Sequence, residues 1–264
     1  MATKSVLITG ANTGIGLEVV RALCSSDQSY QIIVSGRSIA KVQDATIAIE
    51  KEFPSSQSKL IPVEIDICDD QSIRAAFQTV QSKFPKLDAL INNAGGSFDH
   101  YLASSEMTER QIWNQSWNTN TVGTQIMTST FMPLLIQSSD PRLLFVTSGT
   151  SSLTRTDDMA IPVNHSPAKG WPKAGFSVPA YRASKCGMNM MMREWHRLLK
   201  EDGVKVWSIS PGFLATGLGG NPQALRKMGA GHPSVAGEFI RDVLEGQRDK
   251  DVGTVITKDG VQEW

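Results

Sequence analysis

Tyr181 and Lys185 are four residues apart in the stretch SVPAYRASKCGMNMMMREW (residues 177–195), whose spacing predicts a helix. On a helix, residues i and i+4 lie on one face about a turn apart. A free phenol has a pKa of about 10, so it is a poor proton donor or acceptor at neutral pH. A lysine ammonium about 5 Å away, at an effective dielectric constant of about 20, favours the phenolate by ~3 kcal/mol, or ~2 pKa units. The pair therefore predicts a general acid and base, although this spacing also occurs by chance in many helices.

Two further polar residues stand where they could serve the same reaction. Ser148 follows a predicted strand in FVTSG, and its hydroxyl could donate a hydrogen bond to a carbonyl oxygen without being ionised. Asn120 lies inside a predicted helix, three residues before Gly123, where both residue types are unfavourable. A functional position would explain this asparagine, because its amide can hold a water molecule or the lysine ammonium.

The segment TGANTGIG (residues 9–16) follows the first predicted strand and begins the first predicted helix. Its glycines allow a tight turn and a close approach of the backbone to a pyrophosphate, which the N–H groups and the positive helix end would hold. Such a turn alone is a weak signal, but its place in the first βα unit predicts a dinucleotide site. The expected cofactor contacts here are Gly10, Thr13, Gly14, Ile15 and Gly16.

The end of the second predicted strand indicates which dinucleotide fits. An NAD site places a carboxylate about 20 residues beyond the last motif glycine. That position is Gly36, and the surrounding SGRS contains no acid. Arg37 and Ser38 instead offer a guanidinium fork and a hydroxyl, which suit a 2′-phosphate. The sequence therefore favours NADP(H), the alternative being that Arg37 is an ordinary solvated charge.

Three other strand ends supply residues suited to a nucleotide site. EIDICDD ends the third predicted strand where an adenine could lie, and the small residues of INNAGG end the fourth. SPGFLATG follows the sixth and contains a proline-fixed turn. Ligands bind at the carboxyl ends of parallel strands, although turn residues alone would also explain these motifs. The predicted contacts are Asp66, Ile67, Asn93, Ala94, Gly95 and Pro211.

Short apolar runs alternate with longer amphipathic ones along residues 1–264, with no repeat or low-complexity linker, so we expect one domain. Continuous apolar strands imply burial on both faces, hence a parallel sheet covered by helices. This pattern predicts a doubly wound α/β Rossmann fold with seven parallel strands. Strands are expected at 5–9, 31–35, 60–65, 87–91, 142–147, 204–210 and 253–257, and helices at 15–25, 38–52, 70–83, 106–137, 180–201 and 233–246.

The composition argues against several classes of protein. The 26 basic and 26 acidic side chains balance, so no net charge attracts nucleic acid or an anionic membrane. No apolar run approaches the ~20 residues of a membrane span, and the first strand begins too early for a signal peptide. Cys24, Cys68 and Cys186 are widely spaced, and the four histidines lack ligand spacing. We therefore expect reduced thiols, a cytoplasmic location and no metal.

Together these motifs resemble the short-chain dehydrogenase/reductase family, in its single-domain subgroup. TGANTGIG, NNAG, YRASK and SPGFLAT occur in the family order over nearly the whole chain. The resemblance implies that Lys185 also holds the nicotinamide ribose and that Leu214 and Thr216 meet the carboxamide. It implies a catalytic tetrad of Asn120, Ser148, Tyr181 and Lys185.

By the same resemblance, hydride passes between the nicotinamide and a carbonyl carbon. Tyr181 protonates the oxygen, and Asn120 supports a proton-relay water. ANTGIGLEVVRAL, NTVGT and DGVQEW further resemble the carbonyl reductase branch. We therefore expect an NADP(H)-dependent carbonyl reductase or alcohol dehydrogenase acting on a small molecule. The alternatives are a nucleotide-binding scaffold with a regulatory or non-redox role, and a cofactor-dependent isomerase or cyclase.

Two features depart from the family pattern. Members that use NADP often have a basic residue before the second motif glycine, where this chain has Thr13, so the 2′-phosphate prediction depends on Arg37. Ser148 and Tyr181 are 33 residues apart, well beyond the usual family spacing. The extra segment, about 149–178, could form a wall of the substrate pocket, block oligomer contacts, or be a tolerated surface insertion. Monomer and homo-oligomer both stay open.

Residues 213–232 occupy the place of the family's substrate loop. Five glycines after Thr216 suggest a hinged lid over the substrate, the alternative being a mobile surface loop. The methionines at 188–192 and Trp195 are expected to pack in the core or against a partner helix.

Overall fold

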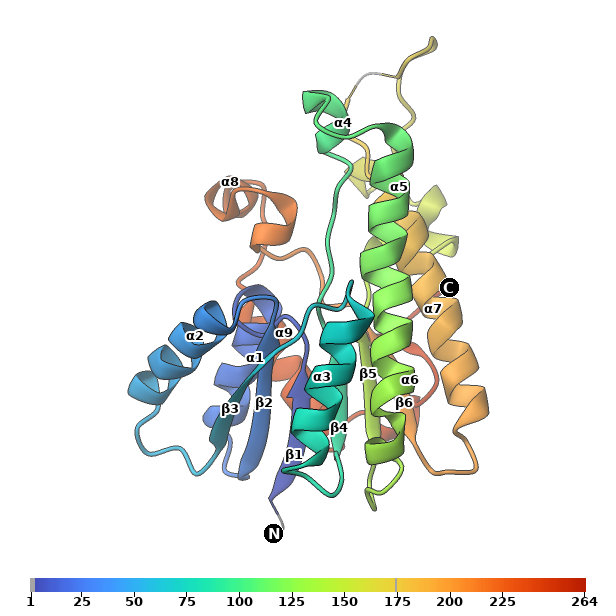
Figure 1. The fold of residues 1–264 in the computed structure, drawn as a ribbon. Helices are drawn as coiled ribbons and strands as arrows, with labels where there is room; N and C mark the ends of the chain where they lie inside the picture. The colour runs from blue at the N-terminus through green and yellow to red at the C-terminus, as the bar shows by residue number, and fades with distance from the viewer. Residues whose placement is uncertain (1–2, 174) are drawn as a thin grey trace.

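A computed structural model describes residues 3–173 and 175–264 of the chain. Its centre is one sheet of eight strands in the order β3-β2-β1-β4-β5-β6-β7-β8 (Figure 1). The order reverses between β1 and β4, as in doubly wound folds. The strands are β1 (Lys4–Ile8), β2 (Tyr30–Gly36), β3 (Lys59–Glu64), β4 (Ala89–Asn92), β5 (Arg142–Val146), β6 (Lys205–Ile209), β7 (Val255–Thr257) and β8 (Gly260–Gln262).

The predicted Rossmann fold is confirmed, but the prediction of seven strands is wrong by one. β1 to β7 pair in parallel, and β8 adds an antiparallel strand at the edge through a hairpin with β7. The two residues between these strands are Lys258 and Asp259, followed by Gly260. An Asp-Gly pair favours such a hairpin, but β8 has the sequence GVQ, which contains no apolar run, unlike VIT in the equally short β7.

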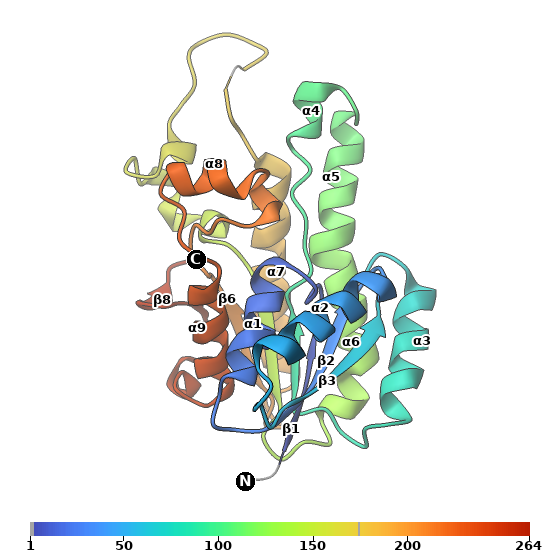
Figure 2. The same ribbon diagram turned by 90° about the vertical axis from the view of Figure 1, so that its left-hand side faces the viewer.

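Helices cover both faces of the sheet (Figure 2). Alternate residues of β1 point to opposite faces: Leu7 joins the core beneath α3, α6 and α7, whereas Ile8 joins the core beneath α1, α2 and α9. Both cores consist mainly of apolar side chains, as burial of a parallel sheet on two faces favours. The helices are α1 (Gly14–Cys24), α2 (Ile39–Glu52), α3 (Asp70–Gln81), α4 (Tyr101–Ser104), α5 (Glu109–Trp117), α6 (Gly123–Leu135), α7 (Pro179–Leu198), α8 (Pro222–Lys227) and α9 (Ser234–Leu244).

The helix expected over 106–137 is present with an irregularity in its middle. α5 and α6 are joined by a π-helical turn, Asn118–Val122. Of the methionine run on α7, Met188 and Met192 are fully buried in the core and Met190 is exposed. Packing therefore accounts for the two buried methionines.

Three irregular segments lie beyond the carboxyl ends of the strands (Figures 1 and 2). The segment after β4 contains the short helix α4. The segment between β5 and α7 contains short 3₁₀ turns at Gly149–Ser151, Thr154–Asp157 and Pro162–Asn164. The segment after β6 contains α8 and closes at its base through a bridge between Leu214 and Gly231. None of the helices in the described part of the chain is long and apolar enough to cross a membrane.

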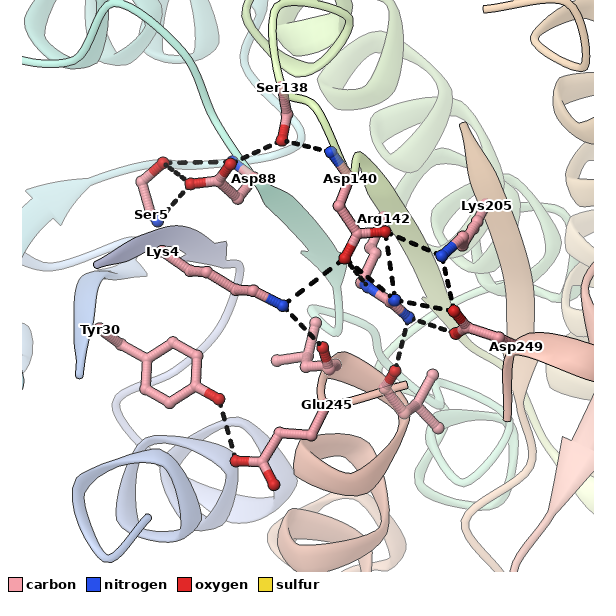
Figure 3. Close-up of polar contacts among 12 residues, drawn as sticks. Lys4, Ser5, Tyr30, Asp88, Ser138, Asp140, Arg142, Lys205, Glu245 and Asp249 are labelled. Carbon is pink, nitrogen blue, oxygen red and sulfur yellow. Dashed lines mark hydrogen bonds and ion pairs between the residues drawn. The ribbon is translucent and has the colours of Figure 1, made fainter. Parts of the chain in front are cut away.

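Charged side chains tie the amino ends of the central strands together (Figure 3). Arg142, only 4% exposed, pairs with Asp140 at 3.1 Å and with Asp249 at 2.7 Å. Lys205 bridges the same two carboxylates, at 2.8 and 2.6 Å. Burial raises the pKa of Asp140, but the hydrogen bond from Lys205 and the charge of Arg142 outweigh it and lower this pKa to about 2. The pKa of Asp249 is lowered for the same reasons.

Replacing Arg142 with Met should destabilise the fold, because two half-buried carboxylates lose a shared cation. We expect a loss of about 2 kcal/mol in the free energy of unfolding at neutral pH, measured by urea denaturation. Carboxylates whose pKa is lowered in the fold stabilise it above their ordinary pKa, near 3.8, and lose that effect as the pH falls toward 2. The free energy of unfolding lost in Arg142→Met should therefore become smaller as the pH falls from about 3.8 toward 2.

The matched control is Arg197→Met, since the Arg197–Glu194 pair is exposed and should contribute nothing measurable. An equal cost for the Arg142 variant at neutral and acidic pH would show that the ion pairs are not its cause.

Candidate active site

The carboxyl ends of β1, β4, β5 and β6 bring the predicted site segments to one edge of the sheet. This edge includes the point between β1 and β4 where the strand order reverses, at which such sheets bind ligands. The glycine turn follows β1, NNAG follows β4, Ser148 follows β5 and Pro211 follows β6. The sequence motifs are therefore neighbours in space.

The glycine turn is shaped by backbone conformation and by close packing. Gly10 and Gly14 have φ of +63° and +57°, which side-chain-bearing residues rarely adopt. A Cβ on Gly16 would lie 2.5 Å from the Gly10 carbonyl oxygen and 2.6 Å from Asn93 Nδ2. Asn93 Nδ2 in turn donates to the carbonyls of Thr9 and Gly10, at 2.8 and 3.1 Å. The turn is thus fastened to the NNAG segment.

The start of α1 leaves room for an anion. Thr13 is its N-cap and is exposed, and its side chain makes no capping hydrogen bond to the described helix. Ile15 is partly buried in the first turn. Thr216 Cβ lies 3.9 Å from the place of a Gly14 Cβ, so the segment after β6 borders the turn. An uncapped helix N-terminus beside glycines fits a pyrophosphate.

The end of β2 is closely packed at the position where an NAD site has its acid. A Cβ on Gly36 would lie 2.5 Å from Asn12 Oδ1 and 3.1 Å from Val42 Cγ2, so a larger residue there would require the Asn12 side chain to move. Arg37 is exposed and forms no ion pair among the described residues. Glu64 Oε2 accepts from the Ile39 N–H at the start of α2, at 3.3 Å, whereas the Ser38 side chain makes no capping bond within that helix.

The Asp66–Ile67 segment is held in place after β3. Asp66 Oδ1 accepts from the Cys68 N–H at 2.9 Å, and the Asp66 N–H donates to Ser72 Oγ at 2.9 Å. Ile67 is buried, and its carbonyl oxygen would overlap a Cβ on Gly123. The glycine near Asn120 therefore has a packing reason.

Asn120 is completely buried within the π-helical turn. Its Oδ1 accepts from the Gly96 N–H at 2.8 Å, and its Nδ2 donates to the Gly96 carbonyl and to Ser184 Oγ, both at 2.9 Å. Ser184 Oγ also donates to the Tyr181 carbonyl at 2.8 Å. Single π turns often mark functional sites, and this one connects the segment after β4 to α7.

Tyr181, Lys185 and Ser148 converge beside this connection. The Lys185 ammonium lies 5.9 Å from the centre of the Tyr181 ring and donates to the Val146 carbonyl at 2.8 Å. It also lies 3.2 Å from the place of a Gly95 Cβ, and Asn120 Oδ1 lies 2.9 Å from that point. Ser148 caps the 3₁₀ turn after β5, accepting from the Thr150 N–H at 3.2 Å. Lys185 and Asn120 therefore both border Gly95, the first glycine after β4.

Burial changes the electrostatics expected for the pair. It raises the pKa of Tyr181 to about 12, against a smaller lowering by the hydrogen bond from Ser148. Burial also lowers the pKa of Lys185 to about 7. The lysine, 3% exposed, is itself only partly charged at neutral pH, so it favours the phenolate less than a full charge would. Without other groups, the phenol keeps its proton.

Three residues near the tetrad escaped the sequence analysis. Asp99 accepts from the N–H groups of Ala180 and Tyr181, and Ser184 links Asn120 to Tyr181. Arg182 donates to the Thr150 carbonyl at 3.1 Å and to Asn164 Oδ1 at 3.0 Å, attaching the segment between β5 and α7 to the helix. Ser184 lies inside YRASK, so the sequence motif could have indicated it. The contacts of Asp99 and Arg182, in contrast, join residues far apart in the chain.

Comparison with known proteins defines the class. A family model of short chain dehydrogenases matches residues 4–158 and 163–225. The short-chain dehydrogenase/reductase tropE of Talaromyces stipitatus is 44% identical over 259 residues, covering 97% of this chain and 96% of that protein. The relative eupG of a Phoma species is 44% identical over 268 residues, with 98% and 96% coverage. The chain therefore belongs to the short-chain dehydrogenase/reductase family of oxidoreductases, and the resemblance seen in its motifs is confirmed.

Solved structures share the fold at lower identity. An NADPH-bound carbonyl reductase from chicken fatty liver matches with a TM-score of 0.79 and 23% identity over the full length of both chains. The Pseudomonas aeruginosa RhlG/NADP complex matches with a TM-score of 0.77 and 20% identity over 98% of this chain and 96% of that one. At sequence identities this low, the two matches show that the fold is shared and carry no conclusion about activity.

Replacing Gly16 with Ala should damage the turn, because the added methyl group meets the Gly10 carbonyl and the Asn93 amide. We expect a loss of about 2 kcal/mol in the free energy of unfolding and at least a tenfold weaker Kd for NADPH, measured by intrinsic fluorescence. Gly260→Ala is the control, since nothing lies within 4 Å of a Cβ there. Wild-type stability and binding in the Gly16 variant would contradict the close packing.

Proposed function

We propose that this protein transfers a hydride between NADP(H) and a carbonyl or secondary alcohol substrate, with Tyr181 as the general acid and base. The observation that carries the proposal is the convergence of Ser148, Lys185 and Tyr181, with Asn120 behind them, at the strand-order reversal. The NADPH-bound carbonyl reductase and the other NADP complexes of this fold add support.

The glycine turn and the uncapped start of α1 are the features that fit the cofactor's pyrophosphate. Arg37 and Ser38 would hold the 2′-phosphate, which a charge-assisted fork binds well. Asp66 and Ile67 would border the adenine. When bound, NADPH supplies the hydride. Around its nicotinamide end we place Asn93, Ala94, Gly95, Lys185, Pro211, Leu214 and Thr216.

The chain's own residues manage the proton. A Tyr181 phenol that is neutral at physiological pH can donate a hydrogen bond, and then its proton, to the substrate oxygen. The Ser148 hydroxyl would orient that oxygen, and the Lys185 cation would stabilise the phenolate left behind. Asn120 fixes the glycine segment and the Tyr181 turn of α7, and a relay water at its amide stays a prediction.

The segments around the site bear on the substrate, and the cysteines bear on the cellular compartment. The segments 149–173, 175–178 and 213–232 lie beyond the reacting edge, where they would select a small-molecule substrate (Figure 2). The three cysteines are free thiols, which favours a reducing compartment such as the cytoplasm. Reduction of such a carbonyl substrate would make this protein a carbonyl reductase or a ketoreductase.

Replacing Tyr181 with Phe removes the proton donor and leaves the ring in place. We expect kcat for NADPH oxidation with a responsive carbonyl compound to fall at least a hundredfold, with the Kd for NADPH within about twofold of wild type. The reaction is followed by NADPH absorbance. Turnover unchanged by this substitution would exclude Tyr181 as the acid.

Replacing Arg37 with Glu should weaken NADPH specifically, because a carboxylate would face the 2′-phosphate. We expect at least a tenfold higher Kd for NADPH and an unchanged Kd for NADH, corresponding to the loss of about 1.5–3 kcal/mol for a charged hydrogen bond. Lys51→Glu, at the far end of α2, makes the same charge change and is the control. Equal effects on both cofactors would refute the 2′-phosphate assignment.

A further inference from the structure

The helix that carries Tyr181 begins where its backbone donors need a partner from elsewhere. Pro179 is its first residue and has no N–H, and Val178 before it makes no side-chain capping bond within the described chain. Asp99 Oδ1 accepts from the Ala180 N–H at 2.9 Å, and Asp99 Oδ2 accepts from the Tyr181 N–H at 3.1 Å. One distant carboxylate therefore satisfies the first two available donors of α7.

The carboxylate arrives from a segment that is itself fixed. Gly96 is bonded on both sides by the Asn120 amide. The Phe98 ring covers Gly96, with Cζ 2.6 Å from the place of a Cβ. Asp99 follows directly and is partly buried. Since Tyr181 is the third residue of α7, a shift of this first turn would displace the phenol.

Asp99 is committed to these two N–H groups. It has no ion-pair partner among residues 3–173 and 175–264, and its carboxylate makes no other hydrogen bond there. The Asp99 carboxylate is therefore free to hold the first turn of α7.

The other polar and titratable groups around Tyr181 act in different ways. Lys185 faces its ring and favours the phenolate, as does the hydrogen bond from Ser148. The Arg182 guanidinium is turned toward Thr150 and Asn164. The rings of His100 and Tyr101, in the segment after Asp99, pack together at 4.1 Å.

We propose that Asp99 is a positioning residue for Tyr181: it fixes the first turn of α7 and so holds the phenol where it can donate its proton. The consequence for catalysis rests on the function proposed above. The anchoring of the first turn requires neither substrate nor cofactor, so it can be tested separately.

The test compares Asp99→Asn, which retains capping ability, with Asp99→Ala, which removes it. Hydrogen exchange at the Ala180 and Tyr181 amides reports the cap without substrate or cofactor. For Asp99→Ala we expect exchange at these two amides to be at least fivefold faster than in the wild type. For Asp99→Asn we expect it to stay within about threefold.

For Asp99→Ala we also expect at least a tenfold loss of kcat, with a Kd for NADPH within about twofold of wild type, and Asp99→Asn should retain most of the wild-type kcat. Asp69→Ala is the control, because Asp69 caps α3 through the Gln71 N–H and should change none of these readouts. Wild-type exchange at the Tyr181 amide or wild-type kcat in Asp99→Ala would overturn the proposal. Faster exchange in Asp99→Ala, with no carbonyl turned over by the wild type, would support Asp99 and count against the proposed function.

Discussion

One buried amide holds the parts of the site together. Asn120 bonds to both backbone groups of Gly96 and to Ser184, and so joins the segment after β4 to the helix that carries Tyr181 and Lys185. The amide reaches these partners from a π-helical turn, which changes the direction of side chains relative to a regular helix. Gly123 allows this turn to pack against the Ile67 carbonyl. The reacting groups thus depend on a local irregularity of a long helix.

The same burial that orders the site governs its proton chemistry. Removing Tyr181 and Lys185 from water disfavours both charged forms, so the pKa of the phenol rises and that of the ammonium falls. Attraction between the Lys185 ammonium and the Tyr181 phenolate would by itself lower the pKa of the phenol. Burial instead favours the neutral phenol and weakens the charge on the lysine. This state suits donation of a proton to a substrate oxygen, which is the step that carbonyl reduction requires.

Much of the fold could be predicted from local patterns. The strands from β1 to β7 are continuous apolar runs, because both faces of the sheet are covered, and that signal is easy to recognise. The glycine turn, NNAG and YRASK are also local, so their meeting at one sheet edge follows from the parallel order of the strands. β8 was not predicted because its three residues, GVQ, contain no apolar run, whereas the equally short β7 reads VIT.

The contacts that escaped prediction join distant parts of the chain. Asp99 resembles any loop carboxylate until α7 is placed beside it, and Arg142 resembles a surface charge until Asp249 is placed against it. The π turn at Asn120 left only an indirect signal, an asparagine and a glycine at poor positions in a helix. The assignment of Arg37 to a 2′-phosphate still depends on sequence and on its exposure.

Hydride transfer from NADPH to a carbonyl carbon is tested most directly with NADPH that carries deuterium at the transferring position, across a panel of aldehydes and ketones. We expect a responsive carbonyl compound whose alcohol product carries one deuterium on the former carbonyl carbon. Binding of NADPH with no labelled product from any carbonyl compound, or conversion of a substrate without incorporation of the label, would contradict it and favour a non-redox role for the site.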